Sequence, residues 1–467
     1  MRGKQVPTVR RNQMDFKTLS FPEAPMIKIQ PPGPRSKEYL AFQSAHEGSA
    51  VSYPRGMPMA LSRARGATVE DVDGNIYIDF FGGAGVMNVG HSNPLVLESV
   101  SEQLSRLTHS LDIPSEPRKA LIDALLSLLP DPLQRIFFGG PTGSDAVEAA
   151  MKLAKFNTRR HTMISFEGAY HGMSSGALSL SSGLSFKEDF LPLIPEIHFV
   201  PYAYCYRCAF GKNSGSCDMD CVKYLEHVLE DPHSGVGKPA ALIVEAIQGE
   251  GGSIVPPEPF LIEIREICDK NQIIMIVDEI QAGLCRTGKM FAFEHSGIEP
   301  DIITLSKGLG GLGFPISCIV YKEELDKWPP GKHIGTFRGN VIAYSAGAAA
   351  LRFMGENNLA EHSSSLGEKL LSWLKDIEKD SSIVGEARGR GLMLGIELVM
   401  DKASKEPAPD LAQRVRTICH QQGLLVEIGG HYSNVVRFLP PLVLTEELAK
   451  KGIEIFADSI RKAEKTL

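Results

Sequence analysis

Two short apolar runs in the middle of the chain each end in polar residues. The run 273–277 leads into Asp278, and the run 302–305 leads into Ser306 and Lys307. Continuous β-branched runs of this length are typical of parallel strands that are covered on both faces. In an open α/β sheet the chemistry lies beyond the carboxyl ends of such strands. The sequence therefore predicts a largely parallel sheet with Asp278 and Lys307 at one shared edge.

Lys307 has surroundings that suit a reactive amine. It follows Asp278 by 29 positions and precedes the glycine-rich segment 308–313, whose backbone can approach a bound group closely. A lysine at a strand end is the residue type for a Schiff base, and pyridoxal phosphate (PLP) also needs a carboxylate against its ring nitrogen. Lys307 and Asp278 fit these two roles. Spacing alone equally allows two strand-end charges that face solvent.

The sequence around these two residues resembles a known family. Segment 277–316 reads VDEIQAGLCRTGKMFAFEHSGIEPDIITLSKGLGGLGFPI, which is similar to the core signature of class III (ω-type) aminotransferases. Segment 71–94, DVDGNIYIDFFGGAGVMNVGHSNP, is similar to the N-terminal signature of the same family. Matching segments extend from about residue 50 to 445, and they are closest to diaminobutyrate and 4-aminobutyrate aminotransferases and to related amino-acid racemases. The resemblance implies PLP as the cofactor.

The same resemblance implies the domain organisation. These enzymes have the α/β fold called fold-type I, with a large domain built on a mainly parallel seven-stranded sheet and a small α/β domain. We expect residues 1–84 to form an N-terminal arm and part of the small domain, 85–344 the large PLP-binding domain, and 345–467 the C-terminal small domain. Five prolines between residues 22 and 34 predict no long regular element within 1–45. Segment 67–81 predicts a β-hairpin that turns at 73–75.

A glycine-rich loop at 139–145 leads into an apparent helix at 146–155. The N-terminus of such a helix offers unsatisfied N–H groups and a positive dipole end, which suit a phosphate. A lone turn of this kind is more often only a helix cap. The resemblance singles out Gly143 and Ser144 as phosphate ligands.

Further cofactor residues follow from the resemblance alone. It implies that Tyr170 stacks on the ring beside His171, and that Gln281 hydrogen-bonds the ring hydroxyl. Glu245 matches a family residue at the end of another buried strand, and Thr336 would reach the phosphate of the partner subunit. Without the resemblance, these residues would be packing residues or ordinary loop side chains.

Three residues are candidates for substrate binding. Glu250 and Arg437 resemble the pair by which ω-aminotransferases admit first a distal amine and then the carboxylate of 2-oxoglutarate. By composition alone, Arg437 would be an ordinary ion-pair partner. Ala84 stands where ornithine enzymes carry an aromatic residue, which argues against ornithine. We expect transfer of an amino group from an ω-amino acid or diamine-type donor, such as diaminobutyrate or 4-aminobutyrate, to 2-oxoglutarate.

Two other functions remain open at this point. An amino-acid racemase or epimerase of the same family would use the same Lys307 and Asp278 without an oxo acid. A non-catalytic regulator could keep the fold, but the presence of Lys307 and the lack of a DNA-binding extension before residue 50 argue against it.

The composition bounds the partners and the location. The net charge of −7 and scattered basic residues argue against nucleic acid. No apolar run approaches the ~20 residues that cross a bilayer, and no secretory signal is visible, so we expect a cytoplasmic enzyme without membrane contact. Because Thr336 would act across an interface, we expect a homodimer or a dimer of dimers.

Four of the eight cysteines cluster in a turn-rich segment that we expect to be a surface insertion. Zinc, a disulfide or free thiols would all satisfy this spacing, and we expect no metal. The cluster comprises Cys205, Cys208, Cys217 and Cys221.

Overall fold

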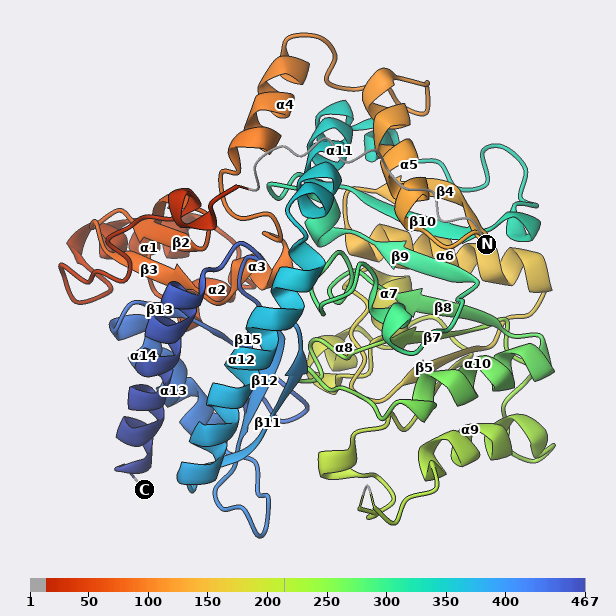
Figure 1. Ribbon diagram of the computed structural model, residues 1–467. Helices are drawn as coiled ribbons and strands as arrows, with labels where there is room; N and C mark the ends of the chain where they lie inside the picture. Colours follow the sequence, from red (N-terminus) through yellow and green to blue (C-terminus); the bar gives the residue numbers. More distant parts are fainter. Residues whose placement is uncertain (1–13, 214, 467) are drawn as a thin grey trace.

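The computed structural model describes residues 14–213 and 215–466. Its centre is a seven-stranded sheet in which every strand except β10 runs parallel to the others. This confirms the predicted mainly parallel sheet (Figure 1). The strands in spatial order are β4 (Leu133–Gly140), β10 (Ser317–Lys322), β9 (Ile302–Leu305), β8 (Ile274–Asp278), β7 (Ala241–Glu245), β5 (Met163–Phe166) and β6 (Ile197–Val200).

The two faces of this sheet belong to two separate hydrophobic cores. Successive residues of β7 alternate, so that Ile243 packs in one core and Leu242 and Val244 in the other. The first core is completed by α6 and α7, and the second by α10, α11 and the C-terminal elements. Burial on both faces explains why these strands read as unbroken apolar runs. The flanking helices are α6 (Gly143–Thr158), α7 (Ser175–Leu180), α8 (Leu184–Lys187), α9 (Asp220–Glu230) and α10 (Pro259–Asn271).

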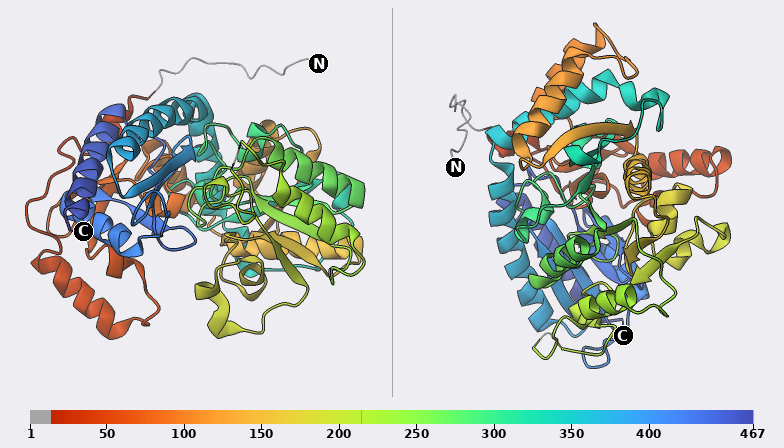
Figure 2. Two further views of the ribbon diagram at one scale, coloured as in Figure 1. Left: turned by 90° about the horizontal axis from the view of Figure 1, so that it is seen from below. Right: turned by 90° about the vertical axis from the view of Figure 1, so that its right-hand side faces the viewer.

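The N-terminal and C-terminal segments come together beside this sheet. The short strand β13 pairs in parallel with β3, so the two ends of the chain share a four-stranded sheet. The hairpin predicted at 67–81 is confirmed by the antiparallel pair of β2 and β3. The left view of Figure 2 shows the red N-terminal elements up to β3 and the blue C-terminal helices grouped on one side of the molecule, and the segment that contains β5 to β8 on the other. The four strands are β1 (Leu61–Arg65), β2 (Thr68–Asp71), β3 (Ile76–Asp79) and β13 (Leu424–Leu425).

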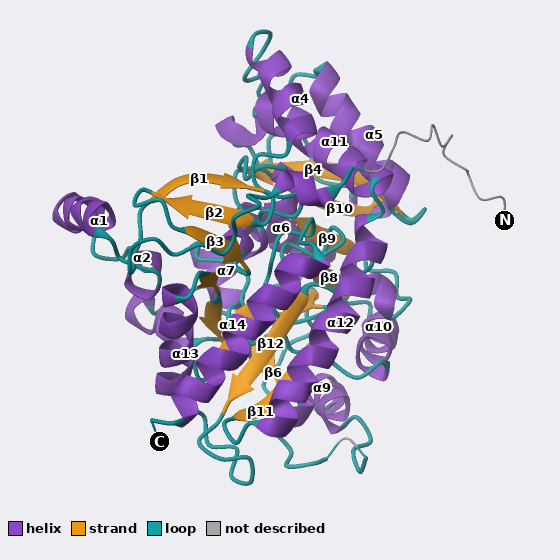
Figure 3. Ribbon diagram, turned by 60° about the vertical axis from the view of Figure 1, so that its left-hand side comes forward, coloured by secondary structure: helices purple, strands orange, loops and turns teal. Residues whose placement is uncertain are grey.

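A second four-stranded sheet lies in the C-terminal third, with helices packed against it (Figure 3). Its order is β11 (Val384–Arg390), β12 (Met393–Leu398), β15 (Val435–Phe438) and β14 (Glu427–Gly429). The long C-terminal helices are α12 (Leu359–Asp380), α13 (Pro409–Gln421) and α14 (Glu446–Glu464). The helices α4 (Pro94–Leu104), α5 (Glu116–Leu128) and α11 (Val341–Glu356) pack together at the other end of the molecule.

The expectation of no long regular element within residues 1–45 is wrong. Helix α1 (Pro34–His46) begins in that segment, because Pro34 occupies its first turn, where a proline costs no hydrogen bond. Residues 1–13 lie outside the described part of the chain. The predicted domain boundary at 344/345 falls inside α11, which runs unbroken from Val341 to Glu356. The division into two domains stays a prediction. Three shorter elements of the N-terminal part of the chain are α2 (Tyr53–Gly56), α3 (Gly82–Gly85) and the 3-10 helix η1 (Phe16–Leu19).

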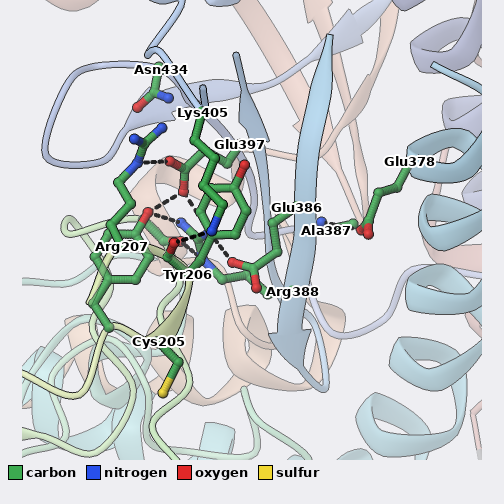
Figure 4. A network of polar contacts seen from close by, with 12 residues as sticks. Cys205, Tyr206, Arg207, Glu378, Glu386, Ala387, Arg388, Glu397, Lys405 and Asn434 are labelled. Atoms are coloured by element: carbon green, nitrogen blue, oxygen red, sulfur yellow. Dashed lines mark hydrogen bonds and ion pairs between the residues drawn. The ribbon is translucent and has the colours of Figure 1, made fainter. Parts of the chain in front are cut away.

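The cysteine-bearing segment is anchored to the second small sheet through a buried carboxylate. Tyr204 and Arg207 both donate hydrogen bonds to Glu397 of β12. Arg388 of β11 donates to the same carboxylate at 2.7 Å (Figure 4). All eight cysteines are unpaired thiols, and the described residues contain no group of three or more His, Cys, Asp or Glu side chains placed to hold a metal ion.

Within residues 14–213 and 215–466, no helix combines the length and apolar composition needed to cross a bilayer.

Candidate active site

Lys307 lies where β9 gives way to the 3-10 helix η5 (Lys307–Gly310). Its φ of 46° is left-handed, which is uncommon for a residue with a side chain. The neighbouring Ser306 hydroxyl donates to the Ile316 carbonyl at 2.9 Å and holds this turn. Burial, reinforced by the positive charge of Arg437, lowers the pKa of Lys307 to about 8. The amine is therefore much easier to deprotonate than that of an exposed lysine.

Asp278 ends β8 and is held by three donors. Its Oδ2 lies 2.7 Å from Nδ1 of His171, while its Oδ1 accepts from the Thr304 hydroxyl at 2.9 Å and the Ile280 N–H at 3.0 Å. The carboxylate is buried. Two neighbouring strands and the loop after β5 thus fix one acidic group at the sheet edge. The other ring nitrogen of His171, Nε2, is buried without a partner among the described residues.

Glu245 ends β7 directly opposite Asp278 in the parallel register. Its two oxygens accept from the backbone N–H groups of Tyr170 at 3.1 Å and Gly249 at 2.8 Å. Burial is the main cause that raises the pKa of Glu245 to about 7, and the neighbouring Asp278 acts in the same direction. Glu245 therefore braces the two loops that carry Tyr170 and Glu250.

The start of α6 meets the loop after β5. Ser144 Oγ accepts a hydrogen bond from the Met173 N–H at 3.2 Å. Gly172 has a φ of 126°, and a Cβ there would lie 2.1 Å from Ser144 Oγ, so this close approach requires glycine. Gly143 and Ser144 form the first turn of a 16-residue helix, whose free N–H groups suit an anion.

Gln281 and Ala84 lie in direct contact. The Gln281 amide donates to the Ala84 carbonyl at 3.1 Å, while its Oε1 is buried and has no partner in the described part of the chain. Ala84 itself has a left-handed φ of 59° in the distorted helix α3. The structure thus brings the N-terminal segment to the sheet edge where Asp278 lies.

The two remaining cofactor candidates differ in environment. Tyr170 is half-buried and packs edge-on against Phe186, with ring centroids 5.3 Å apart. Thr336 is exposed on the 3-10 helix η7 (Thr336–Gly339), and its carbonyl lies 2.8 Å from Nε2 of His109. Its side chain is therefore available at the surface.

The substrate candidates Glu250 and Arg437 form an ion pair. Glu250 Oε2 lies 2.6 Å from Nη2 of Arg437, which is only 2% exposed. Glu427 stands directly opposite Arg437 in the pairing of β14 with β15, and its Oε2 lies 3.5 Å from the same Nη2. Arg437 Nε and Nη1 and Glu427 Oε2 are buried without hydrogen-bond partners among the residues described. The guanidinium therefore has N–H donors that are available to a ligand.

Reasoning from the sequence missed Glu427 and Thr304. Thr304 is the one polar side chain in the apolar run 302–305, and this exception was a usable signal. Glu427 interrupts the apolar segment 424–428 ten positions before Arg437, which is a weaker signal because it does not reveal the pairing.

This arrangement fits PLP. The sheet edge offers a reactive amine at Lys307, a fixed carboxylate at Asp278 and a helix N-terminus at Gly143. The unpartnered atoms His171 Nε2 and Gln281 Oε1 show that the polar groups around it are not satisfied by the protein alone. A phosphorylated heterocycle with an aldehyde is complementary to this set.

Comparison with known proteins also indicates a PLP-dependent enzyme. Residues 50–460 match the family model described as class-III aminotransferase. A diaminobutyrate–2-oxoglutarate aminotransferase of Haemophilus influenzae is 41% identical over 440 residues, which cover 92% of this chain and 97% of the relative. A Rhizobium meliloti protein of the same name is 41% identical over 419 residues, covering 87% and 89%.

Solved structures give the same answer. An (S)-enantioselective ω-transaminase from Thermomicrobium roseum superimposes with a TM-score of 0.84 at 28% identity, covering 92% of this chain and 98% of that one. An amine transaminase from an uncultivated Pseudomonas species, in a PLP-bound form, gives a TM-score of 0.82 at 26% identity, covering 90% and 98%. The chain therefore belongs to the class III aminotransferases and is a PLP-dependent enzyme that transfers amino groups.

Proposed function

We propose that this enzyme transfers the terminal amino group of 2,4-diaminobutyrate, or of a similar ω-amine donor, to 2-oxoglutarate. The observation that carries this choice is the 41% identity, over 92% of the chain, to a relative named for this reaction. The ion pair of Glu250 with Arg437 supports it, because it offers a carboxylate-binding group that can be masked.

We assign the cofactor contacts as follows. Lys307 attaches to PLP, Asp278 faces the ring nitrogen, and Gln281 faces the ring hydroxyl. Tyr170 covers the ring, while His171 and Glu245 hold Asp278 and the surrounding loops in place. The phosphate ligands in this proposal are Gly143, Ser144 and the partner subunit's Thr336.

The protein's part in the chemistry is proton transfer and charge placement. Bound PLP supplies an electron sink for the pair left when the donor's amine-bearing carbon loses a proton. Lys307 Nζ takes that proton as a general base and returns one as a general acid. A pKa of about 8 suits both directions near neutral pH. Asp278, held by its three donors, keeps negative charge beside the ring nitrogen.

Glu250 and Arg437 would let one pocket serve both half-reactions. While the amine donor is bound, Glu250 masks the charge of Arg437. When 2-oxoglutarate enters, its carboxylate displaces Glu250 and takes a bidentate contact with the guanidinium. Ala84 leaves the pocket floor without a large side chain, in keeping with a short donor.

We propose a homodimer, or a dimer of dimers, on the strength of an exposed apolar patch. The segments 104–113 and 334–339 meet through a hydrogen bond from the Ser110 N–H to the Gly339 carbonyl at 2.9 Å. Ile334 is 76% exposed and Phe337 70% exposed, which is unusual for side chains this large. The other exposed members of the patch are Leu104, Leu107, Leu111 and Ile113.

Arg338 clamps the loop that bears Thr336. It is buried, donates to the carbonyls of His333 and Gly335, and lies over the Phe137 ring at 4.8 Å from the centroid. Thr336 is therefore held on the patch, where a partner chain would be in reach.

A mixed dimer tests the contribution across the interface. Lys307→Ala chains and Thr336→Ala chains are each expected to be impaired alone. In a mixed dimer, the site with an intact Lys307 would also receive the intact Thr336 of its partner, so we expect about half of wild-type activity per dimer. No recovery on mixing would exclude this arrangement.

The reaction itself is tested by a screen of amine donors with 2-oxoglutarate, run beside chiral analysis of single amino acids. Glutamate formation from 2,4-diaminobutyrate is the expected result. Racemisation of an α-amino acid without an oxo acid would replace the proposal by a racemase. A cytoplasmic location stays a prediction.

A further inference from the structure

The pocket around Arg437 contains more negative charge than one guanidinium needs. Glu250 occupies Nη2 at 2.6 Å, and Glu427 approaches the same nitrogen at 3.5 Å, too far for a good hydrogen bond. Arg416 on α13 also acts on Glu427 through its charge, but its side chain is hydrogen-bonded to Gln413. Glu427 is thus a carboxylate only 12% exposed, whose ion pair with Arg437 is long and is shared with Glu250.

Both the acidic and the basic member of this cluster have buried polar atoms without a hydrogen-bond partner. Glu427 Oε2 is buried without a hydrogen-bond partner in the described residues, and so are Arg437 Nε and Nη1. Leaving such atoms unpaired is costly, so their persistence points to a ligand that satisfies them. The ammonium group of a donor would complement Glu427, and the carboxylate of the acceptor would complement the free nitrogens of Arg437 in the other half-reaction.

The cluster adjoins the cofactor edge of the site, because Gly249, the neighbour of Glu250, lies so close to Gln281 that a Cβ there would be 2.0 Å from Gln281 Oε1. In keeping with this placement, the charge of Arg437 contributes to the lowered pKa of Lys307, and the charge of Lys307 acts on the pKa of Glu427. Tyr53 of α2 lies near enough to be affected: partial burial, followed by the charges of Glu427 and Glu250, raises the pKa of its phenol to about 12, although the side chain is 54% exposed. A donor whose terminal amine reacts beside Lys307 can therefore present its far end to Glu427 while Glu250 stays on Arg437.

We propose that Glu427 binds the second, non-reacting ammonium group of the donor and so selects diamino acids over donors with one amine. This inference rests on the proposed aminotransferase reaction and deepens it. 4-Aminobutyrate has the reacting amine and the carboxylate but no second ammonium. 2-Oxoglutarate has only carboxylates, so Glu427 contributes nothing favourable to the acceptor half-reaction.

The test is the Glu427→Gln variant of the holoenzyme, which keeps the shape of the side chain and removes its charge. We compare kcat/KM for 2,4-diaminobutyrate and for 4-aminobutyrate at saturating 2-oxoglutarate. A charge-assisted hydrogen bond is lost for the first donor only, so the preference for the diamino acid should fall about 10- to 100-fold. The KM for 2-oxoglutarate should stay the same or decrease.

A matched control removes the same charge at an exposed place in the C-terminal third. Glu406 lies on an exposed turn, and Glu406→Gln should leave the donor preference unchanged. A second measurement needs no variant: wild-type enzyme is compared on 2,4-diaminobutyrate and on 4-amino-2-hydroxybutyrate, in which a hydroxyl replaces the ammonium. We expect the hydroxy compound to be the poorer donor by a similar factor.

The possible results distinguish a wrong role for Glu427 from a wrong aminotransferase reaction. If wild-type enzyme transfers an amine from 2,4-diaminobutyrate but Glu427→Gln lowers both donors equally, the assignment of Glu427 is overturned and the reaction stands. If Glu427→Gln does not fold, equal use of the hydroxy and diamino compounds by the wild type overturns the assignment. If the wild type uses neither diaminobutyrate nor 4-aminobutyrate with 2-oxoglutarate, the proposed function itself fails.

Discussion

Two buried arginines on the same small sheet differ in how many of their N–H groups are hydrogen-bonded. Arg388 uses all three of its nitrogens: Nε bonds the Gly252 carbonyl at 2.9 Å, Nη1 bonds Glu386 and Glu397, and Nη2 bonds the Tyr204 hydroxyl at 3.3 Å. Arg437 hydrogen-bonds through Nη2 alone, to Glu250. The two side chains are similarly buried, at 9% and 2% exposure.

The difference separates a structural tie from a ligand site. The cluster around Glu397 joins the cysteine-bearing segment to β11 and β12, and Tyr204, Arg207 and Arg388 occupy both oxygens of its carboxylate, although Arg207 Nη2 has no partner among the described residues (Figure 4). The cluster around Arg437 carries the cost of unpaired buried atoms, which only a ligand can recover. Changes in the first should therefore alter stability, and changes in the second should alter catalysis.

The largest effect is expected at the reactive end of the ligand site. Lys307→Ala should lower turnover by more than about 10⁴-fold, because it removes both the attachment point and the proton carrier. The free energy of unfolding of the apoenzyme should hardly change, and borohydride treatment with PLP should no longer add mass to the chain. Lys379→Ala, at an exposed helix position, is the control. Normal turnover in Lys307→Ala would remove this lysine from the mechanism.

The second-largest effect is expected at the cluster around Glu397. Glu397→Ala leaves Arg388 and Arg207 without their shared buried carboxylate, so we expect a loss of about 3–5 kcal/mol in the free energy of unfolding, measured with urea. The kcat of the folded fraction should stay close to that of the wild type. A large drop in kcat with unchanged stability would contradict the separation of the two clusters.

Arg437→Ala should lower catalysis and leave the free energy of unfolding largely unchanged, the reverse of Glu397→Ala. An incoming carboxylate loses its charge-assisted partner, which costs about 2–4 kcal/mol, or ~30- to 1,000-fold, in the half-reaction with 2-oxoglutarate. Single-turnover measurements of each half-reaction test this. Equal losses in both half-reactions would defeat the model in which Glu250 and the acceptor exchange on Arg437.

A smaller effect concerns pH. The neutral amine of Lys307 is the form that attacks PLP, and burial lowers its pKa to about 8. The rate at which the apoenzyme captures PLP should therefore rise about tenfold from pH 7 to pH 9 and then level off. A rate that keeps rising tenfold per unit above pH 9 would show an unshifted lysine.

The smallest effect is expected at the cysteine cluster. Replacing its four cysteines by serine should change kcat by less than about twofold, because the polar tie at Glu397, not the thiols, anchors this segment. Elemental analysis of the wild type is the companion measurement. One zinc per chain, lost together with activity on chelation, would contradict our expectation of no metal.

Much of the fold could be predicted because its signals are local. The apolar runs before Asp278 and Lys307 form strands, since β-branched segments of that length suit a sheet buried on both faces. Helix α1 was missed because the prolines around it were taken as helix breakers, whereas Pro34 begins the helix.

The sequence by itself determined the chemistry: the lysine, the strand-end carboxylate and the glycine-rich helix start all lie in short recognisable segments. Only the tertiary structure decided which groups meet around them. Glu427 faces Arg437 because β14 and β15 pair in one register, and His171 reaches Asp278 because β5 and β8 lie in the same sheet. Such meetings depend on strand register and burial, which arise from contacts between residues far apart in the chain, so no local pattern encodes them.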